Sequence, residues 1–212
     1  MDVHEAVRAH YAGGDLSGVL LGALRAQGVD TDHLSVEELA RVDQLHAGFL
    51  PATRHVLDTL DLTVESAVLD VGCGIGGGTR VAAADHGCRA VGVDLSPDFV
   101  RAAEGLTDSV GLQDLASFVV TDGTTLPFDD ASFDAAFMIH VGMNVPDKAA
   151  LFREVHRVLA PGGRFCVYEQ MRTSDEPLPY PLPWAVDEAT SFVEAQQAYE
   201  DALRTAGFGV TS

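Results

Sequence analysis

The sequence is poor in several features that define whole classes of protein. Its 212 residues include a single lysine, three cysteines and no run of about 18 apolar residues. The missing apolar run argues against a membrane-spanning helix. The first residues, MDVHEAVRAHYAGGD, also lack the apolar centre of a signal peptide. We therefore expect a cytoplasmic protein with no membrane partner.

Positive charge is scarce as well. Lys and Arg total 13 against 32 Asp and Glu, which gives a formal net charge of −19. Nucleic-acid binding depends on Lys and Arg that neutralise phosphates, and docking on anionic membranes has the same requirement. The composition thus disfavours both kinds of partner.

The residues that usually hold metals are few or scattered. Cys73, Cys88 and Cys166 form no CxxC pair, and no two of the eight histidines form an HxxxH or HExxH motif. An odd number of isolated cysteines is not typical of a disulfide framework or a zinc site. We expect no metal and no disulfide.

Strand and helix patterns alternate from residue 66 onward, after an N-terminal part that is helical. Alternation of this kind predicts parallel strands with right-handed crossovers. The fold class expected is α/β, a Rossmann-like, doubly wound, mostly parallel sheet with helices on both faces. Strands are expected at 67–72, 88–96, 116–123, 132–140 and 164–170; helices at 15–28, at 35–60 with a break near Gly48 and Pro51, at 79–87, from Ser96 onward, at 147–163 and at 191–208.

The chain divides into two expected parts. Residues 1–60 have no place in such a sheet and are predicted to form an N-terminal helical lid, while 61–212 form the Rossmann-like domain. Residues 171–188 contain four prolines, so they are predicted to be an irregular loop. We expect this loop and the lid to close over the acceptor side of the site.

A glycine-rich turn follows the first predicted strand. The segment VLDVGCGIGGGTR, residues 68–80, holds five glycines, and Gly72, Gly74 and Gly77 satisfy GxGxxG. Asp94 ends the next strand, 20 residues after Gly74. A carboxylate at that place can accept hydrogen bonds from both hydroxyls of a ribose. The pattern therefore predicts a cofactor that contains a nucleoside.

Two kinds of cofactor remain open on this pattern. A dinucleotide would place its pyrophosphate at the helix N-terminus. Asp70, two residues before the first glycine, instead suits a cationic ligand group, or it orients the turn by accepting its amides. S-adenosylmethionine carries a ribose, an ammonium and a sulfonium but no phosphate. No tyrosine is followed four residues later by lysine, which argues against a short-chain dehydrogenase.

Four segments in order resemble the successive motifs of class I S-adenosylmethionine-dependent methyltransferases. They are VLDVGCGIGG, VGVDLS, VTDGTTLPFDDASFDAAF and LFREVHRVLAPGGRF, within residues 45–170. The flanks HYAGGDLSGVLLGAL, RVDQLHAGF and YPLPWA resemble a bacterial small-molecule subgroup near the sarcosine and dimethylglycine N-methyltransferases and the ubiquinone/menaquinone-type enzymes. The resemblance implies S-adenosylmethionine as the cofactor.

The resemblance also implies roles for individual residues. Asp70 would shape the turn, and Asp94 would bind the ribose hydroxyls. Leu95 would pack on the adenine, and Asp122 would accept a hydrogen bond from the adenine amino group. Gly72, Gly74 and Gly76 would let the backbone approach the methionine and ribose parts. Gly123 would lie beside Asp122, and His140 would lie near the methyl donor. Gln44 and His46 of the lid would cover the cofactor.

The acceptor side is far less determined. His140, Glu169 and Tyr11 are the candidates for contact with the acceptor; Glu169 and Tyr11 suit an amine, and His140 suits a phenol or quinol as a base. An amine nitrogen is favoured on the subgroup resemblance, with O- or C-methylation of a phenolic or quinone-like compound as the alternative. A protein that binds the cofactor without catalysis is a further alternative. The oligomeric state stays open, with a homodimer as one arrangement.

The last predicted strand lies at an edge of the sheet. Families of this kind add two strands after the helix that ends near Gly207, whereas this sequence stops at GFGVTS. An uncovered edge strand invites pairing with another chain. We expect the C-terminal strands to be missing and the full protein to have about 50 to 60 further residues on the usual domain size.

Overall fold

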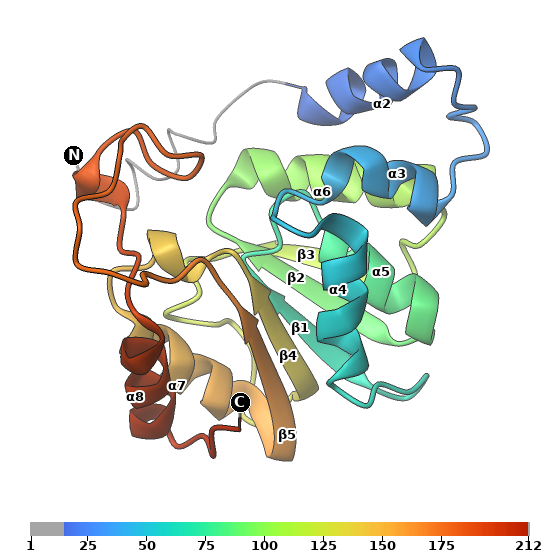
Figure 1. Ribbon diagram of the computed structural model, residues 1–212. Coiled ribbons are helices and arrows are strands. Elements are labelled where there is room, and N and C mark those ends of the chain that lie inside the picture. Colours follow the sequence, from blue (N-terminus) through green and yellow to red (C-terminus); the bar gives the residue numbers. More distant parts are fainter. Residues whose placement is uncertain (1–14, 212) are drawn as a thin grey trace.

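A parallel sheet between two layers of helices forms the centre of the computed structural model, which describes residues 15–211 (Figure 1). All strand pairs are parallel and the order is β3-β2-β1-β4-β5. The predicted α/β class and doubly wound arrangement are confirmed. The strands are β1 Ala67–Val71, β2 Arg89–Asp94, β3 Ala116–Val120, β4 Phe133–Ile139 and β5 Leu159–Tyr168.

The strand order reverses between β1 and β4. From β1 the chain moves outward through β2 and β3, and it then returns to the other side of β1 for β4 and β5. Loops that leave β1 and β4 therefore diverge from each other. A crevice opens there beyond the carboxyl ends of the strands, where ligands bind in open α/β sheets.

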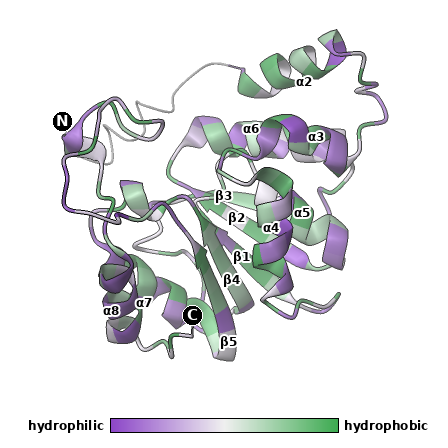
Figure 2. Ribbon diagram, in the orientation of Figure 1, coloured by the Kyte–Doolittle hydropathy of each residue, from purple (hydrophilic) through white to green (hydrophobic). Residues whose placement is uncertain are grey.

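Side chains of alternate residues fill two separate cores, one on each face of the sheet. On β1, Val68 packs with Val56 and Val81 on one face, while Leu69 packs with Phe152 on the other. Strands buried on both faces account for the continuous apolar run in this segment. The sheet is the most hydrophobic layer (Figure 2). One face carries α4 Phe49–Asp58, α5 Gly77–His86 and α6 Pro97–Ser109; the other carries α7 Lys148–Val158 and α8 Gln196–Ala206.

Two N-terminal helices add a smaller apolar cluster. In α2, Leu16–Ala26, Leu24 is fully buried and packs with Leu106 of α6. The helix α3, Val36–Asp43, begins with the predicted capping box, in which Ser35 and Glu38 satisfy each other's backbone amides. By contrast, α4 packs on the sheet itself. Within the described residues 15–60, the part outside the three layers therefore consists of α2, α3 and the segment that follows α3.

Two of the predicted boundaries that differ from the structure involve a proline. The helical break falls at residues 44–48, and Pro51 lies inside the first turn of α4, where a missing amide removes no helical hydrogen bond. Helix α7 ends at Val158, and the Pro161-Gly162-Gly163 turn lies within the bounds of β5. A register shift between Phe133 and Ala135 of β4 accommodates this turn.

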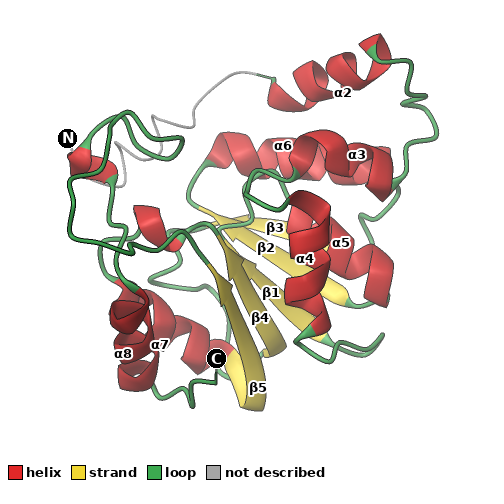
Figure 3. Cartoon of the chain, viewed as in Figure 1, coloured by secondary structure: helices red, strands yellow, loops and turns green. Residues whose placement is uncertain are grey.

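Beyond β5 the chain loses regular structure. Within residues 15–211, β5 pairs only with β4 and so forms one edge of the sheet, as expected. The predicted irregular segment extends past residue 188 as far as α8, which begins at Gln196 rather than at the predicted residue 191. This segment contains one short 3-10 helix, η2 Glu188–Thr190 (Figure 3). No helix in the described part of the chain is both long and apolar enough to cross a membrane.

Candidate functional site

The turn between β1 and α5 brings backbone close to neighbouring segments. Gly72 has φ +72°, and a Cβ there would lie 2.3 Å from Cγ2 of Val141, so the position requires glycine. The amides of Gly72 and Cys73 both donate to the carbonyl oxygen of Val93, at 2.8 and 2.9 Å. The glycine turn is thereby fixed against the carboxyl end of β2.

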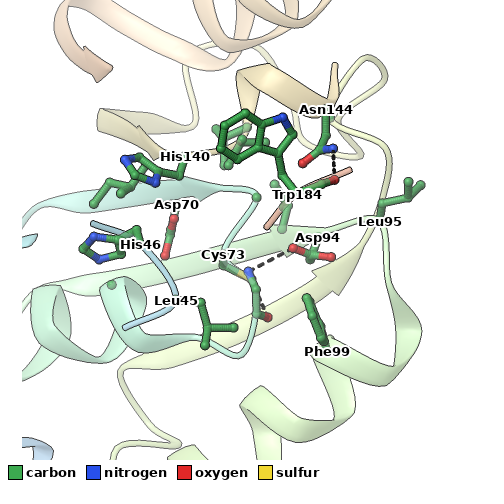
Figure 4. Close-up of a pocket in the computed structure, with 18 of the residues that line it drawn as sticks. Leu45, His46, Asp70, Cys73, Asp94, Leu95, Phe99, His140, Asn144 and Trp184 are labelled. Atoms are coloured by element: carbon green, nitrogen blue, oxygen red, sulfur yellow. Dashed lines mark hydrogen bonds between the residues drawn. The ribbon is translucent and has the colours of Figure 1, made fainter. Parts of the chain in front are cut away.

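Asp94 is the last residue of β2, and its carboxylate accepts hydrogen bonds from two backbone amides. Its carboxylate accepts from the amide of Gly74 at 2.9 Å and from that of Ser96 at 2.8 Å (Figure 4). Burial raises the pKa of Asp94, and these amides act in the opposite direction. One carboxylate therefore joins the glycine turn to the start of α6 while it lines the pocket.

Asp70 lies deeper, at the base of the same turn. It is fully buried, and its Oδ2 accepts from the hydroxyl of Thr79 at 2.7 Å. Burial raises the pKa of Asp70 to about 7, and the nearby charge of Asp94 adds to the shift. This geometry ties the end of β1 to α5 and leaves the carboxylate at the pocket wall.

Asp122 follows β3 on the far side of the turn. This exposed carboxylate accepts from the amide and the hydroxyl of Thr124, at 2.9 and 3.0 Å. Gly123 beside it is buried, with φ +76°. Leu95 and Phe99 lie with Asp94 on one side of the pocket in Figure 4, whereas His46 and His140 lie on the other.

A pocket of about 740 Å³ collects most of the residues expected from the sequence. Gly76 does not line it, because this glycine caps α5 and faces Phe118 and Arg80. Glu169 does not line it either, and Tyr11 lies outside the described residues. Those that line it are Gln44, His46, Asp70, Gly72, Gly74, Asp94, Leu95, Asp122, Gly123 and His140.

The segment between α3 and α4 forms one wall of the pocket. The side-chain oxygen of Gln44 accepts from the hydroxyl of Thr53 at 2.5 Å. The same hydroxyl lies 2.9 Å from Nε2 of His46, whose Nδ1 lies 3.0 Å from the carbonyl oxygen of Ala47. This network fixes Gln44 and His46 against α4. Burial lowers the pKa of His46.

His140 lies directly after β4 in an unusual conformation. Its φ is +54°, a region that residues other than glycine rarely adopt. Its amide donates to the carbonyl oxygen of Tyr168 at 2.9 Å, and its ring stacks on the Tyr168 ring with centroids 5.4 Å apart. The His46 ring meets it edge-on at 5.9 Å. Burial, with a smaller effect of His46, lowers the pKa of His140 to about 4, so the imidazole is neutral at pH 7.

Glu169 faces away from the pocket and supports the loop after β4. Its Oε1 accepts from the amides of Val141 and Gly142, at 2.7 and 2.6 Å. Burial raises the pKa of this carboxyl group to about 7. Glu169, which was expected to contact the acceptor, instead stabilises the loop that begins at His140.

The sequence analysis missed a buried ion pair beneath the glycine turn. Arg80, the last residue of the quoted turn segment, is fully buried and lies 2.9 Å from Oδ2 of Asp43. It also donates to the carbonyl oxygens of Ile75 and Ala103. An arginine after a run of glycines was the available signal. Through this residue α3 is joined to the turn.

The proline-rich segment reaches the pocket through contacts with the loop after β4. Asn144 donates to the carbonyl oxygens of Trp184 and Thr190, at 3.0 and 3.2 Å. The indole nitrogen of Trp184 donates to Ser191 at 3.1 Å. These bonds attach the segment to the loop after β4 and place Trp184 over the pocket, as Figure 4 shows.

Fold and site together define a class I methyltransferase domain of the Rossmann-like type. The match to the family described as "Methyltransferase domain" covers residues 69–167. That stretch runs from the glycine turn through β5 and contains Asp94, Asp122 and His140.

Characterised relatives agree with this assignment. The chain is 38% identical over 140 residues to a 2-methyl-6-phytyl-1,4-hydroquinone methyltransferase of Synechocystis, covering 66% of this chain and 42% of the relative. It is 35% identical over 161 residues to phosphoethanolamine N-methyltransferase 3 of Arabidopsis thaliana, covering 76% of this chain and 32% of the relative. The chain thus spans less than half the length of these relatives.

Solved structures share the fold at lower identity. A Haemonchus contortus phosphoethanolamine N-methyltransferase, in complex with S-adenosyl-L-methionine, has a TM-score of 0.70 and 24% identity over 79% of this chain and 39% of its own. The [4+2]-cyclase SpnF also has a TM-score of 0.70 and 24% identity, over 93% of this chain and 70% of its own. The same fold therefore carries more than one kind of reaction.

S-adenosylmethionine is the cofactor of this family, and the residues present fit it. A half-buried carboxylate at the end of β2, an exposed one after β3 and a glycine turn that brings backbone to the cavity supply the polar groups that a nucleoside needs. No described group of three or more His, Cys, Asp or Glu side chains is arranged to hold a metal ion.

Proposed function

We propose that the chain transfers a methyl group from S-adenosylmethionine to a small-molecule acceptor. The observation that carries the proposal is one pocket with the nucleoside-type carboxylates on one side and the neutral imidazole of His140 on the other. The cofactor supplies an activated methyl group on its sulfonium sulfur. What the protein must add is alignment, exclusion of water and, for a protonated acceptor, a base.

The site residues have distinct roles in this proposal. Asp94 would accept from the ribose hydroxyls, and Asp122 from the adenine amino group, with Leu95 against the ring. The glycine turn would approach the methionine part, and Gln44 and His46 would cover it. Because the His140 imidazole is unprotonated at neutral pH, it can accept a proton from an acceptor hydroxyl.

The partners follow from composition rather than from the site. A net charge of −19 supports a small-molecule acceptor over a nucleic acid, and the cytoplasm is proposed as the location on the same grounds as in the sequence. An amine acceptor rests on the subgroup resemblance, while a hydroxyl acceptor would use His140 directly.

Two measurements test the function. Calorimetry should show binding of S-adenosylhomocysteine and of S-adenosylmethionine but not of NADH. Labelled methyl transfer to a panel of phenols and amines should then be lost in His140→Asn, because asparagine tolerates a positive φ but is a poor base. His55→Asn, an exposed residue outside the pocket, is the matched control and should retain the rate. Cofactor binding without transfer to any acceptor would indicate a binding protein instead.

A further inference from the structure

The charges around the pocket restrict what can enter it beside the cofactor. No lysine, arginine or glutamate lines the pocket among residues 15–211. Its carboxylates are Asp43, Asp70, Asp94 and Asp122. Each already has a partner within the protein, and the last three are the groups assigned to the cofactor or its turn.

The part of the pocket left for the acceptor is therefore uncharged. Its histidines are His46 and His140. Burial lowers the pKa of both imidazoles, and it lowers that of His140 to about 4, so the His140 imidazole is neutral at pH 7. An ammonium group would find no carboxylate there, and a phosphate or carboxylate would find no cation. An uncharged hydroxyl, by contrast, meets a neutral base.

Two apolar side chains at the pocket, Leu45 and Phe49, remain largely exposed, and we call them the apolar mouth. They are 59% and 66% exposed, although both line the cavity. Leu45 lies beside the glycine turn, and Phe49 begins α4 three residues after His46. Exposed apolar surface that continues from a cavity is typical of a ligand-binding groove.

The conformation of Phe49 strengthens this interpretation. Its φ is +49°, and the preceding Gly48 has φ +83°. A left-handed conformation is unfavourable for a bulky residue, so such residues rarely occupy it. Strained residues of this kind concentrate at ligand sites. Here the strained residue lines the cavity while its aromatic side chain remains largely exposed.

Resting on the proposed function, we propose that the acceptor is a hydroxy-aromatic compound with an apolar chain that lies on Leu45 and Phe49. Its hydroxyl proton passes to the imidazole of His140 as the oxygen forms its bond to the methyl carbon. The sulfur–carbon bond breaks with its electron pair left on sulfur, and the proton then passes to water.

Binding measurements with matched compounds test this class without requiring turnover. We would titrate 4-hexylphenol, phenol and hexylamine into protein saturated with S-adenosylhomocysteine. Hexylphenol should bind at least tenfold more tightly than phenol, and hexylamine should not bind measurably. Equal affinities for the two phenols, or tighter binding of the amine, would overturn the proposal.

Substitutions at the mouth locate the apolar chain. Phe49→Ser should weaken hexylphenol binding about tenfold and leave the affinities for phenol and S-adenosylhomocysteine unchanged. Val64→Ser, at a residue 71% exposed and outside the pocket, is the matched control and should change none of the three. If Phe49→Ser leaves hexylphenol binding unchanged, the proposed placement is wrong.

The remaining outcomes show whether something other than the acceptor occupies the apolar mouth. They also distinguish failure of this proposal from failure of the proposed function. Weakened S-adenosylhomocysteine binding in Phe49→Ser would assign the mouth to the cofactor. A change only in sedimentation, or only in binding to phosphatidylcholine vesicles, would assign it to a second copy or to a lipid surface; each of these overturns the proposal. Failure of the unmodified protein to bind S-adenosylhomocysteine would instead refute the proposed function.

Discussion

Replacement of Asp94 by alanine tests the cofactor site most directly. The carboxylate accepts two backbone amides at 2.8 and 2.9 Å and is the group assigned to the ribose. A hydrogen bond to a charged group contributes about 1.5–3 kcal/mol. Loss of the ribose bonds should therefore raise the dissociation constant for S-adenosylhomocysteine by about 10- to 150-fold.

The same side chain fixes the glycine turn, so the experiment must separate binding from folding. Calorimetry gives the affinity, and the thermal midpoint of the ligand-free protein gives the stability. Asp94→Asn retains one acceptor oxygen and should have an intermediate affinity. Asp114→Ala, an exposed residue outside the pocket, should match the unmodified protein. Unchanged affinity in folded Asp94→Ala would remove Asp94 from the ribose role.

Three further predictions concern the framework around the site. Arg80→Met leaves the Asp43 carboxylate buried without its partner and should lower the free energy of unfolding in urea by about 3–5 kcal/mol; the double change with Asp43→Leu should recover part of this, and a purely additive loss would contradict the pairing. Burial raises the pKa of Glu169 from 4.5 to about 7, so the folded state binds more protons than the unfolded state between these pH values, and the contribution of Glu169 to stability falls as pH rises through this range. Urea titrations at several pH values should therefore show a smaller fall in the free energy of unfolding for Glu169→Gln. Equal pH dependence in the two proteins would refute the assignment. Gly72→Ala should destabilise the protein more than Gly28→Ala, because both have positive φ but only the first would place its Cβ against another residue; equal thermal midpoints would show that the approach to Val141 is unimportant.

Much of the fold was predictable because short-range signals and burial act together in this chain. The glycine turn, the Ser35 capping box and the Ser96-Pro97 helix start lie where the sequence places them. The parallel direction of the strands followed from their alternation with helices, whereas the order β3-β2-β1-β4-β5 was not predicted. In contrast, the sequence alone does not show whether Pro51 ends one helix or lies in the first turn of the next, and the structure places it in the first turn of α4.

The residues expected to hold the cofactor were easier to place from the sequence than those expected near the acceptor. Asp94 and Asp122 are fixed by their places at the ends of adjacent strands, and the parallel pairing of β2 with β3 brings those ends together. Glu169 likewise ends a strand, yet its carboxylate turns to the amides of Val141 and Gly142. That orientation depends on unpaired donors in a distant loop, which sequence position does not reveal.

The support beneath His140 shows why a reactive residue and its setting differ in predictability. A histidine after β4 is visible in the sequence, but its neutral state depends on three segments that meet only in the fold. Tyr168 stacks on its ring from β5, His46 meets it from the segment before α4, and Glu169 holds the loop that follows it. Because these contacts come from residues 46 and 168–169, burial of the imidazole is a property of the assembled sheet. The chemistry of the acceptor side therefore depends on the same edge strand and helical segment that enclose the pocket.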